Sequence, residues 1–149
     1  MQKITTFLTY QNQAEEAANL YTSIFKNSKI THTTGSAGTV VSVAFQLNGQ
    51  AFIALNGGPQ FAFAEGISLF VTCENQEEVD ELWDKLSEGG EKGPCGWLKD
   101  KFGVSWQIIP SALSRMLQDR NPEKSKQVME AMCQMTKIDI QSLERVYAS

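Results

Sequence analysis

The sequence predicts an α+β fold built from two βαβββ units, which form curved mixed sheets and are followed by C-terminal helices. Three observations support this prediction. A segment near the amino terminus recurs in the middle of the chain, each copy leads from a strand-like run into an amphipathic helix, and a glycine-containing turn precedes the last strand of each half.

The repeat relates Ile4–Glu15 to Ile67–Glu78 without gaps. Six of the twelve aligned positions are identical, and the offset is 63 residues (67 − 4). Similarity at a fixed offset is typical of duplicated structural units. We therefore expect the two halves of the chain to share one order of strands and helices.

Each copy of the repeat has an asparagine, Asn12 or Asn75, before a helical pattern, with a glutamate three residues later. This spacing predicts a capping box, in which the asparagine side chain accepts from free N–H groups of the first turn and the glutamate reaches back. Apolar residues then recur at helical spacing and predict one buried face per helix. They are Ala14, Ala17, Ala18, Tyr21, Ile24 and Phe25 in the first helix, and Val79, Leu82, Trp83 and Leu86 in the second.

Asn48-Gly49 separates two strands predicted over residues 39–47 and 50–56, after an earlier strand over 29–34. Asn-Gly is a strong hairpin signal because both turn positions take positive φ. A hairpin closed there places Phe45 opposite Phe52 and Ala44 opposite Ile53. The face expected to pack under the helix then carries Val41, Val43, Phe45, Phe52 and Ala54.

In the second half, Gly89-Gly90 is expected to end the helix. Strand segments over 91–98, a turn over 99–103 and a last strand over 104–109 complete the unit. The predicted organisation is paired βαβββ modules over residues 1–110 (about 1–60 and 64–110), then a C-terminal helical extension over 111–149, in a single domain overall.

The extension has clear helix signals. Pro122 after Asn121 predicts a helix start, and Asp139 predicts the cap of a last short helix, with Ile138 and Leu143 as a hydrophobic staple. Between them, an apolar stripe rich in methionine is expected to pack against the body of the protein or against a dimer partner. Its residues are Val128, Met129, Met132 and Met135.

Composition limits the classes of function. The chain has 149 residues, a net charge of −4 and a pI of about 5.0, which argues against nucleic-acid binding, since that usually needs a basic face. No apolar run is long enough to cross a membrane, and residues 1–6 show no signal-peptide pattern. The three cysteines (Cys73, Cys95 and Cys133) form no CxxC pair and are expected to be reduced thiols in the cytoplasm.

The duplicated βαβββ halves resemble the vicinal-oxygen-chelate superfamily of glyoxalases, bleomycin-resistance proteins and dioxygenases. Three segments, residues 14–21, 55–59 and 95–107, are similar to its PhnB-like branch, also described as demethylubiquinone methyltransferase-like. This resemblance implies a glyoxalase-like fold over residues 3–109. It also implies a homodimer, but it names no definite reaction.

The resemblance further implies where a divalent cation would be bound, because enzymes of the superfamily take His, Glu or Gln ligands from the first and last strand of each half. The matching positions here are Thr5, Ile53, Ser68 and Gln107, with Asn56 in place of Ile53 if that strand is shifted. None carries a charge, and divalent cations prefer imidazole or carboxylate ligands. We therefore predict neither a metal site nor another cofactor. The only histidine, His32, is expected on a surface or edge strand away from these positions.

These considerations predict a pocket for a small organic ligand, enclosed by the two sheets and lined by aromatic rings with a few hydroxyl and amide groups. The candidate pocket residues are Thr5, Phe7, Ser68, Phe70, Cys95, Trp97, Ser105 and Gln107, with Cys95 and Trp97 at the rim. Phe7 and Phe70 are equally compatible with a filled core.

Three alternatives are also compatible with the sequence: a glyoxalase-like enzyme, the methyltransferase that the branch name suggests, and an interaction protein that acts through its dimer surface. Against methyl transfer, Gly57-Gly58-Pro59 is followed by no helical pattern, so it does not form a Rossmann-type turn. A Cys95 nucleophile would need a base, and the only candidate is His32.

Overall fold

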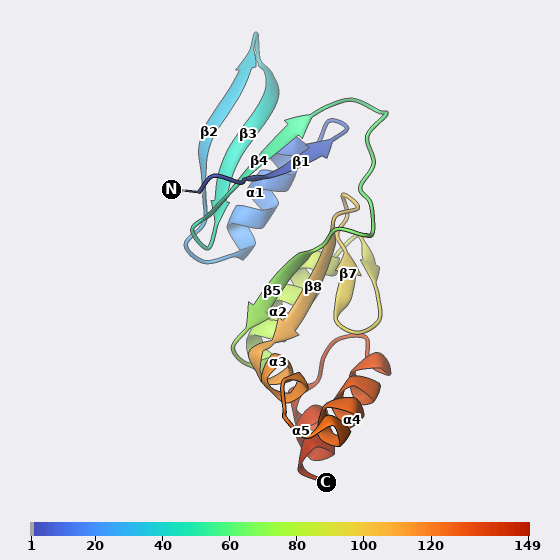
Figure 1. Cartoon of the computed structure of the whole chain (residues 1–149). Helices are drawn as coiled ribbons and strands as arrows, with labels where there is room; N and C mark the ends of the chain where they lie inside the picture. The colour runs from blue at the N-terminus through green and yellow to red at the C-terminus, as the bar shows by residue number, and fades with distance from the viewer. Residues whose placement is uncertain (1) are drawn as a thin grey trace. The chain divides into compact units, whose positions relative to one another are not determined.

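The computed structural model describes residues 2–149 and divides the chain into two compact units. The first unit ends at Phe63, and the second spans Ala64–Ser149. Each unit has a four-stranded mixed sheet with a helix packed on one face (Figure 1). The two sheets and five helices agree with the predicted α+β class. That the units form one domain stays a prediction.

The first unit has the predicted βαβββ order. Its elements are β1 (Thr6–Tyr10), α1 (Ala14–Ile24), β2 (Lys29–Ser36), β3 (Thr39–Leu47) and β4 (Gln50–Asn56). The strand order in the sheet is β1-β4-β3-β2, with β1 parallel to β4 and the other pairs antiparallel. The first and last strands of the unit are therefore neighbours.

The core of the first unit lies between α1 and the sheet. Ala14, Ala17 and Ala18 are fully buried, and such small side chains let the helix lie close to the strands. The hydroxyl groups of Tyr10 and Tyr21 are 3.0 Å apart and hydrogen-bonded, so both buried phenols are satisfied. The predicted hairpin register is confirmed, with Phe45 opposite Phe52 and Ala44 opposite Ile53.

The predicted capping box of the first helix is wrong. Helix α1 begins at Ala14, its N-cap is Gln13, and the Gln13 side chain makes no capping hydrogen bond. The backbone N–H of Ala14 instead donates to Oδ1 of Asn56, at the end of β4. A side chain from a distant strand has thus replaced the local cap, because β4 ends beside the helix start. In the second unit Asn75 caps α2 as predicted, accepting from the N–H of Glu78.

The second unit repeats this order with shorter strands. Its elements are β5 (Leu69–Cys73), α2 (Gln76–Ser87), β6 (Glu91–Lys92), β7 (Trp97–Lys99) and β8 (Ser105–Pro110). The strand order is β5-β8-β7-β6, again with the first and last strands parallel. All four residues predicted for the inner face of α2 are buried.

Asp100 organises the turn between β7 and β8, although its carboxylate is almost completely buried. Its Oδ1 accepts from the backbone N–H groups of Phe102 and Val104, at 2.9 and 3.0 Å. Its Oδ2 accepts from the indole N–H of Trp106 at 2.9 Å. A buried carboxylate is tolerable only when such donors replace water. Asp100 therefore fixes both the turn and the start of β8.

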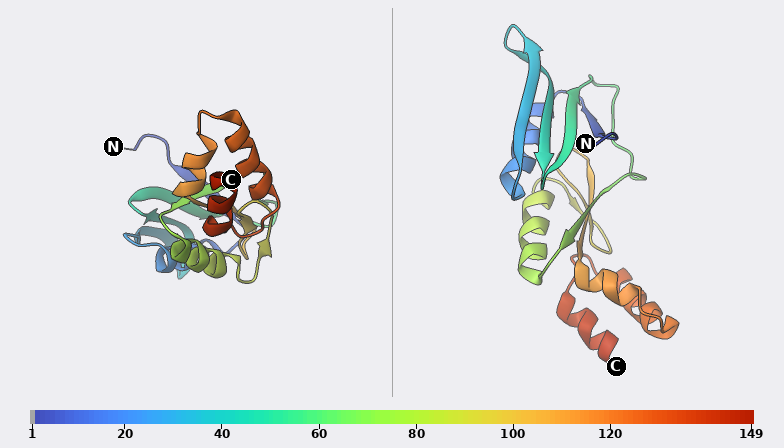
Figure 2. Two further views of the ribbon diagram at one scale, coloured as in Figure 1. Left: turned by 90° about the horizontal axis from the view of Figure 1, so that it is seen from below. Right: turned by 60° about the vertical axis from the view of Figure 1, so that its left-hand side comes forward.

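Three helices form the C-terminal extension of the second unit: α3 (Ser111–Leu117), α4 (Pro122–Cys133) and α5 (Ile140–Ala148). They pack against one another (Figure 2). The predicted start at Pro122 and the Asp139 cap are confirmed. The apolar cluster of the extension contains Ile109, Leu113, Met116, Val128, Ile138 and Leu143. Within residues 2–149, every helix is too short or too polar to span a membrane.

Replacing Asp100 tests its role in the turn. Asp100→Asn keeps the shape of the side chain but leaves one oxygen where two accept, so a buried N–H loses its partner. We expect the free energy of unfolding to fall by about 2–3 kcal/mol, measured by urea denaturation at neutral pH. Asp84→Asn, at an exposed position of α2, should change it by less than about 0.5 kcal/mol. Equal effects of the two substitutions would contradict the role given to Asp100.

Candidate functional site

The strand pairing of the second unit brings three of the predicted pocket residues into one row. Phe70 lies opposite Gln107 across the β5–β8 pair, and Gln107 lies opposite Trp97 across the β8–β7 pair. We call the face of a sheet that is turned away from its helix the distal face. Their neighbours Leu98 and Trp106 are buried on the helix side, so the row lies on the distal face.

A hydrogen bond orients the amide of Gln107. Its Nε2 donates to the hydroxyl oxygen of Ser68 at 2.9 Å. Ser68 directly precedes β5, so the bond joins the start of the first strand to the last strand of the unit. The amide carbonyl of Gln107 and the hydroxyl proton of Ser68 remain on the distal face, one as an acceptor and one as a donor.

A second row runs beside the first. Ser105 lies opposite Lys99 across β8 and β7, and the Ser105 side chain is buried. The ammonium group of Lys99 is 2.6 Å from a carboxylate oxygen of Glu65 and 4.0 Å from one of Glu91. The hydrogen bond from Lys99 lowers the pKa of Glu65, and Glu65 raises the pKa of Lys99. The positive charge of Lys99 is therefore compensated by the carboxylates of Glu65 and Glu91.

Cys95 lies in the loop between β6 and β7, two residues before Trp97, and is partly buried. Its backbone has a left-handed conformation, with φ of 60°. Burial raises the pKa of the Cys95 thiol, and contact with Cys133 raises it further. A neutral thiol is a poor nucleophile, so the surroundings of Cys95 do not favour nucleophilic catalysis.

In the first unit, the row at the matching positions contains three apolar residues and ends at a histidine. Phe7 lies opposite Ile53, Ile53 opposite Ala44, and Ala44 opposite His32. Phe7 is 53% exposed, so it is not part of the core of its own unit. His32 is exposed on the edge strand β2, as predicted, and β3 separates it from Ile53. Thr5 precedes β1 and is partly buried.

The residues at the four metal-ligand positions do not suit a divalent cation. In the second unit the positions hold a hydroxyl and an amide that bond to each other. In the first unit Ile53 offers no donor atom. Asn56 is already engaged, because its Oδ1 caps α1 and its Nδ2 donates to the carbonyl of Val40 at 3.1 Å. Across residues 2–149, no three His, Cys, Asp or Glu side chains gather where they could hold a metal ion.

Lys99 and Glu65 are neighbours of the site that were not predicted from the sequence. Lys99 could have been placed there, because side chains two apart in a strand share a face and Trp97 was already a candidate. Glu65 lies 34 residues away in sequence, in a segment without a periodic pattern, and no sequence signal pointed to it. The prediction that Thr5 and Phe7 line the same pocket as the residues of the second unit stays a prediction.

The sequence matches the model of the 3-demethylubiquinone-9 3-methyltransferase family over residues 2–109. Among solved structures, the PhnB protein from Bacillus cereus is 41% identical, with a TM-score of 0.67. That similarity covers 73% of this chain and 99% of the Bacillus chain. No curated protein matches the sequence.

More distant structures share the fold. A possible glyoxalase from Bacillus cereus has 15% identity and a TM-score of 0.54, covering 73% of this chain and 98% of its own. A glyoxylase/bleomycin resistance protein/dioxygenase domain from Frankia sp. EAN1pec also has 15% identity, with a TM-score of 0.51, covering 74% of this chain and 92% of its own. Both support the glyoxalase-like fold predicted from the duplicated halves.

Proposed function

The chain belongs to the 3-demethylubiquinone-9 3-methyltransferase (PhnB-like) family, and we propose that it binds a small, neutral organic molecule on the distal face of the second sheet, without a metal ion. The observation that carries this proposal is the row of Phe70, Gln107 and Trp97, in which two aromatic rings flank an oriented amide.

The aromatic rings supply the apolar part of the site. Phe70 is 55% exposed on the surface of its unit. Burial of a phenylalanine side chain stabilises a protein by roughly 1.5–3 kcal/mol, so a ligand that covers this ring gains binding energy. Trp97 is partly buried on the other side of Gln107. A flat or apolar ligand placed over the row would cover both rings, and ring contacts of this kind favour aromatic or conjugated molecules.

The polar pair sets which group of the ligand is recognised. Because Ser68 accepts from Nε2 of Gln107, the amide cannot rotate without losing a hydrogen bond. Its Oε1 is thereby presented as an acceptor, next to the hydroxyl of Ser68 as a donor. A ligand with a donor and an acceptor side by side, such as a carboxamide or a hydroxy-ketone, matches this arrangement.

The charges beside the row favour a neutral ligand. Lys99 is the cation of the adjacent row, and Glu65 and Glu91 both lie within 4.0 Å of it. One positive charge therefore stands against two negative ones, which gives an anionic ligand no net attraction. The proposed ligand class therefore excludes phosphorylated and carboxylated metabolites.

The methyl transfer in the family name has no support from the site. A methyl donor bound at the first turn of a Rossmann-type unit would need a glycine-rich segment between strand and helix. Between β1 and α1 the chain has Gln11-Asn12-Gln13, and between β5 and α2 it has Glu74-Asn75. We therefore propose binding rather than methyl transfer. Conversion of the bound ligand during incubation would overturn this choice.

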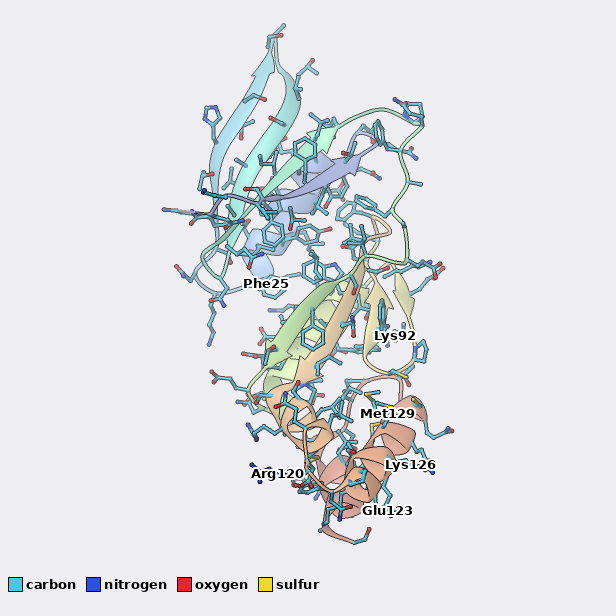
Figure 3. All side chains as sticks on the ribbon, in the orientation of Figure 1. Phe25, Lys92, Arg120, Glu123, Lys126 and Met129 are labelled. Atoms are coloured by element: carbon cyan, nitrogen blue, oxygen red, sulfur yellow. The ribbon has the colours of Figure 1, made fainter. Side chains whose placement is uncertain are left out.

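We further propose that the protein is a cytoplasmic homodimer. Met129 is 50% exposed on α4, the helix that also carries the labelled Glu123 and Lys126 (Figure 3). Phe7 and Val41 are also exposed on the first sheet, which does not carry the proposed ligand row, and contact with a second copy would cover them. The three cysteines are free thiols, as expected in a reducing compartment.

Ligand binding can be tested by thermal shift against a panel of neutral aromatic and conjugated metabolites in buffer that contains EDTA. At 100 times its dissociation constant, a ligand should raise the free energy of unfolding by about 2.7 kcal/mol, because it binds only the native state. For each hit, Gln107→Leu should weaken binding about tenfold, through the loss of one buried hydrogen bond. Calorimetric titration measures this change.

Gln141→Leu is the matched control, because it makes the same substitution at an exposed position of α5. The Gln141→Leu variant should bind each hit with the same affinity as the wild-type protein. The proposal fails if no member of the panel shifts the transition, if hits bind equally well to the Gln107 variant, or if EDTA abolishes their binding.

The oligomeric state has a direct test in light scattering coupled to size-exclusion chromatography. One chain has a mass of 16.5 kDa, so a homodimer should have a mass of 33 kDa (2 × 16.5). We expect this mass across the micromolar range. A mass of 16.5 kDa at all concentrations would show that the exposed apolar side chains serve another purpose.

A further inference from the structure

Two of the three cysteines lie together, although 38 positions separate them in sequence (133 − 95). Cys95 is in the loop that joins β6 to β7, and Cys133 is the last residue of α4. The backbone N–H of Cys95 donates to the carbonyl of Met135, two residues after Cys133, and the Cys133 side chain lies close enough to raise the pKa of the Cys95 thiol. Both thiols are reduced, Cys133 is exposed, and Cys95 is partly buried.

Backbone contacts hold the two segments together independently of the thiols. The N–H of Cys95 donates to the carbonyl of Met135 at 2.8 Å, and the N–H of Gly96 donates to that of Thr136, also at 2.8 Å. A Cβ atom at Gly96 would lie only 3.0 Å from Cγ1 of Ile138, so the loop is closely packed against the segment after α4. This arrangement keeps Cys133 near Cys95 without a covalent link.

We propose that Cys95 and Cys133 are a peroxide-sensitive thiol pair, which oxidises to an intramolecular disulfide that ties the β6–β7 loop to the end of α4. Two neighbouring thiols need little movement to form such a bond, provided that their backbones are already held in place. The loop runs directly into Trp97, so the bond would fix the segment that carries this residue of the candidate site.

The order of the two chemical steps follows from exposure. The thiolate of Cys133 attacks a peroxide oxygen, the O–O bond breaks, and the released hydroxide takes a proton to become water, which leaves Cys133 as a sulfenic acid. The thiolate of Cys95 then attacks that sulfur, forms the S–S bond and expels a second hydroxide, which is protonated to water. Two thiols and one hydrogen peroxide thus give one disulfide and two waters.

Cys95 suits the second step better than the first. Its thiol is partly buried, so a dissolved oxidant reaches it less readily than it reaches the exposed thiol of Cys133. A sulfenic acid at Cys133 would form within its reach, which makes reaction between the two thiols intramolecular and fast.

Cys73 serves as an internal control. It is completely buried beneath α2, and burial raises the pKa of its thiol to about 12, with a further contribution from Glu78. It should therefore stay reduced while the other two cysteines react. A count of free thiols after oxidation separates the pair from general cysteine oxidation.

The test exposes the reduced full-length protein to hydrogen peroxide and then alkylates it under denaturing conditions. The number of alkylated cysteines should fall from three to one, and peptide mapping without reductant should show Cys95 joined to Cys133. Dithiothreitol should restore all three. Because the bond closes a long loop, the oxidised protein should melt roughly 5 °C higher than the reduced protein.

Two serine variants show which thiol reacts first. In Cys95→Ser, the sulfenic acid at Cys133 should persist and be trapped by dimedone, whereas the wild-type protein should give little trapped product. In Cys133→Ser, at an exposed position, peroxide should change neither the thiol count nor the melting temperature. Three alkylated cysteines after peroxide, a disulfide between two chains, or overoxidation of Cys133 with Cys95 still free would each overturn the proposal.

Discussion

Parallel pairing of the first and last strands is the constraint on which the arrangement of each unit depends. It brings Phe7 beside Ile53 in the first unit and Phe70 beside Gln107 in the second. The two residues of each pair are more than 35 positions apart in sequence. The helix after the first strand covers one face of the sheet, as such a crossover connection requires. The other face is left to carry functional side chains, so one pairing rule places both the core and the candidate site.

The two units have diverged in what they place at equivalent positions. The second unit has a polar pair, Ser68 and Gln107, at the start of its first strand and in its last. The first unit has an apolar side chain, Ile53, where the second has Gln107. The polar side chain at the end of β4, Asn56, is used to cap a helix. A duplicated fold can thus keep its strand register while its two distal faces take on different chemistry, which is why only the second unit carries the proposed polar contacts.

Much of the fold was predictable because its signals are local. Asn48-Gly49 set the hairpin register, and both residues have the positive φ that the turn requires. The cap of α1 was mispredicted because its partner, Asn56, is 42 positions away from Ala14 in sequence. Of the site, the sequence indicated Gln107 and Ser68 but not the bond between them. It could not reveal the neighbouring thiols or the Lys99–Glu65 ion pair, since both are contacts between segments that only folding brings together.

The central claim is that a neutral, hydrogen-bonded pair stands where a divalent cation would need charged or imidazole ligands. Elemental analysis of protein purified without chelators tests this claim most directly. We expect far less than one divalent ion per chain after gel filtration, with the same value for the wild-type protein and Gln107→Ala. One tightly held ion per chain that disappears in the Gln107 variant would contradict it.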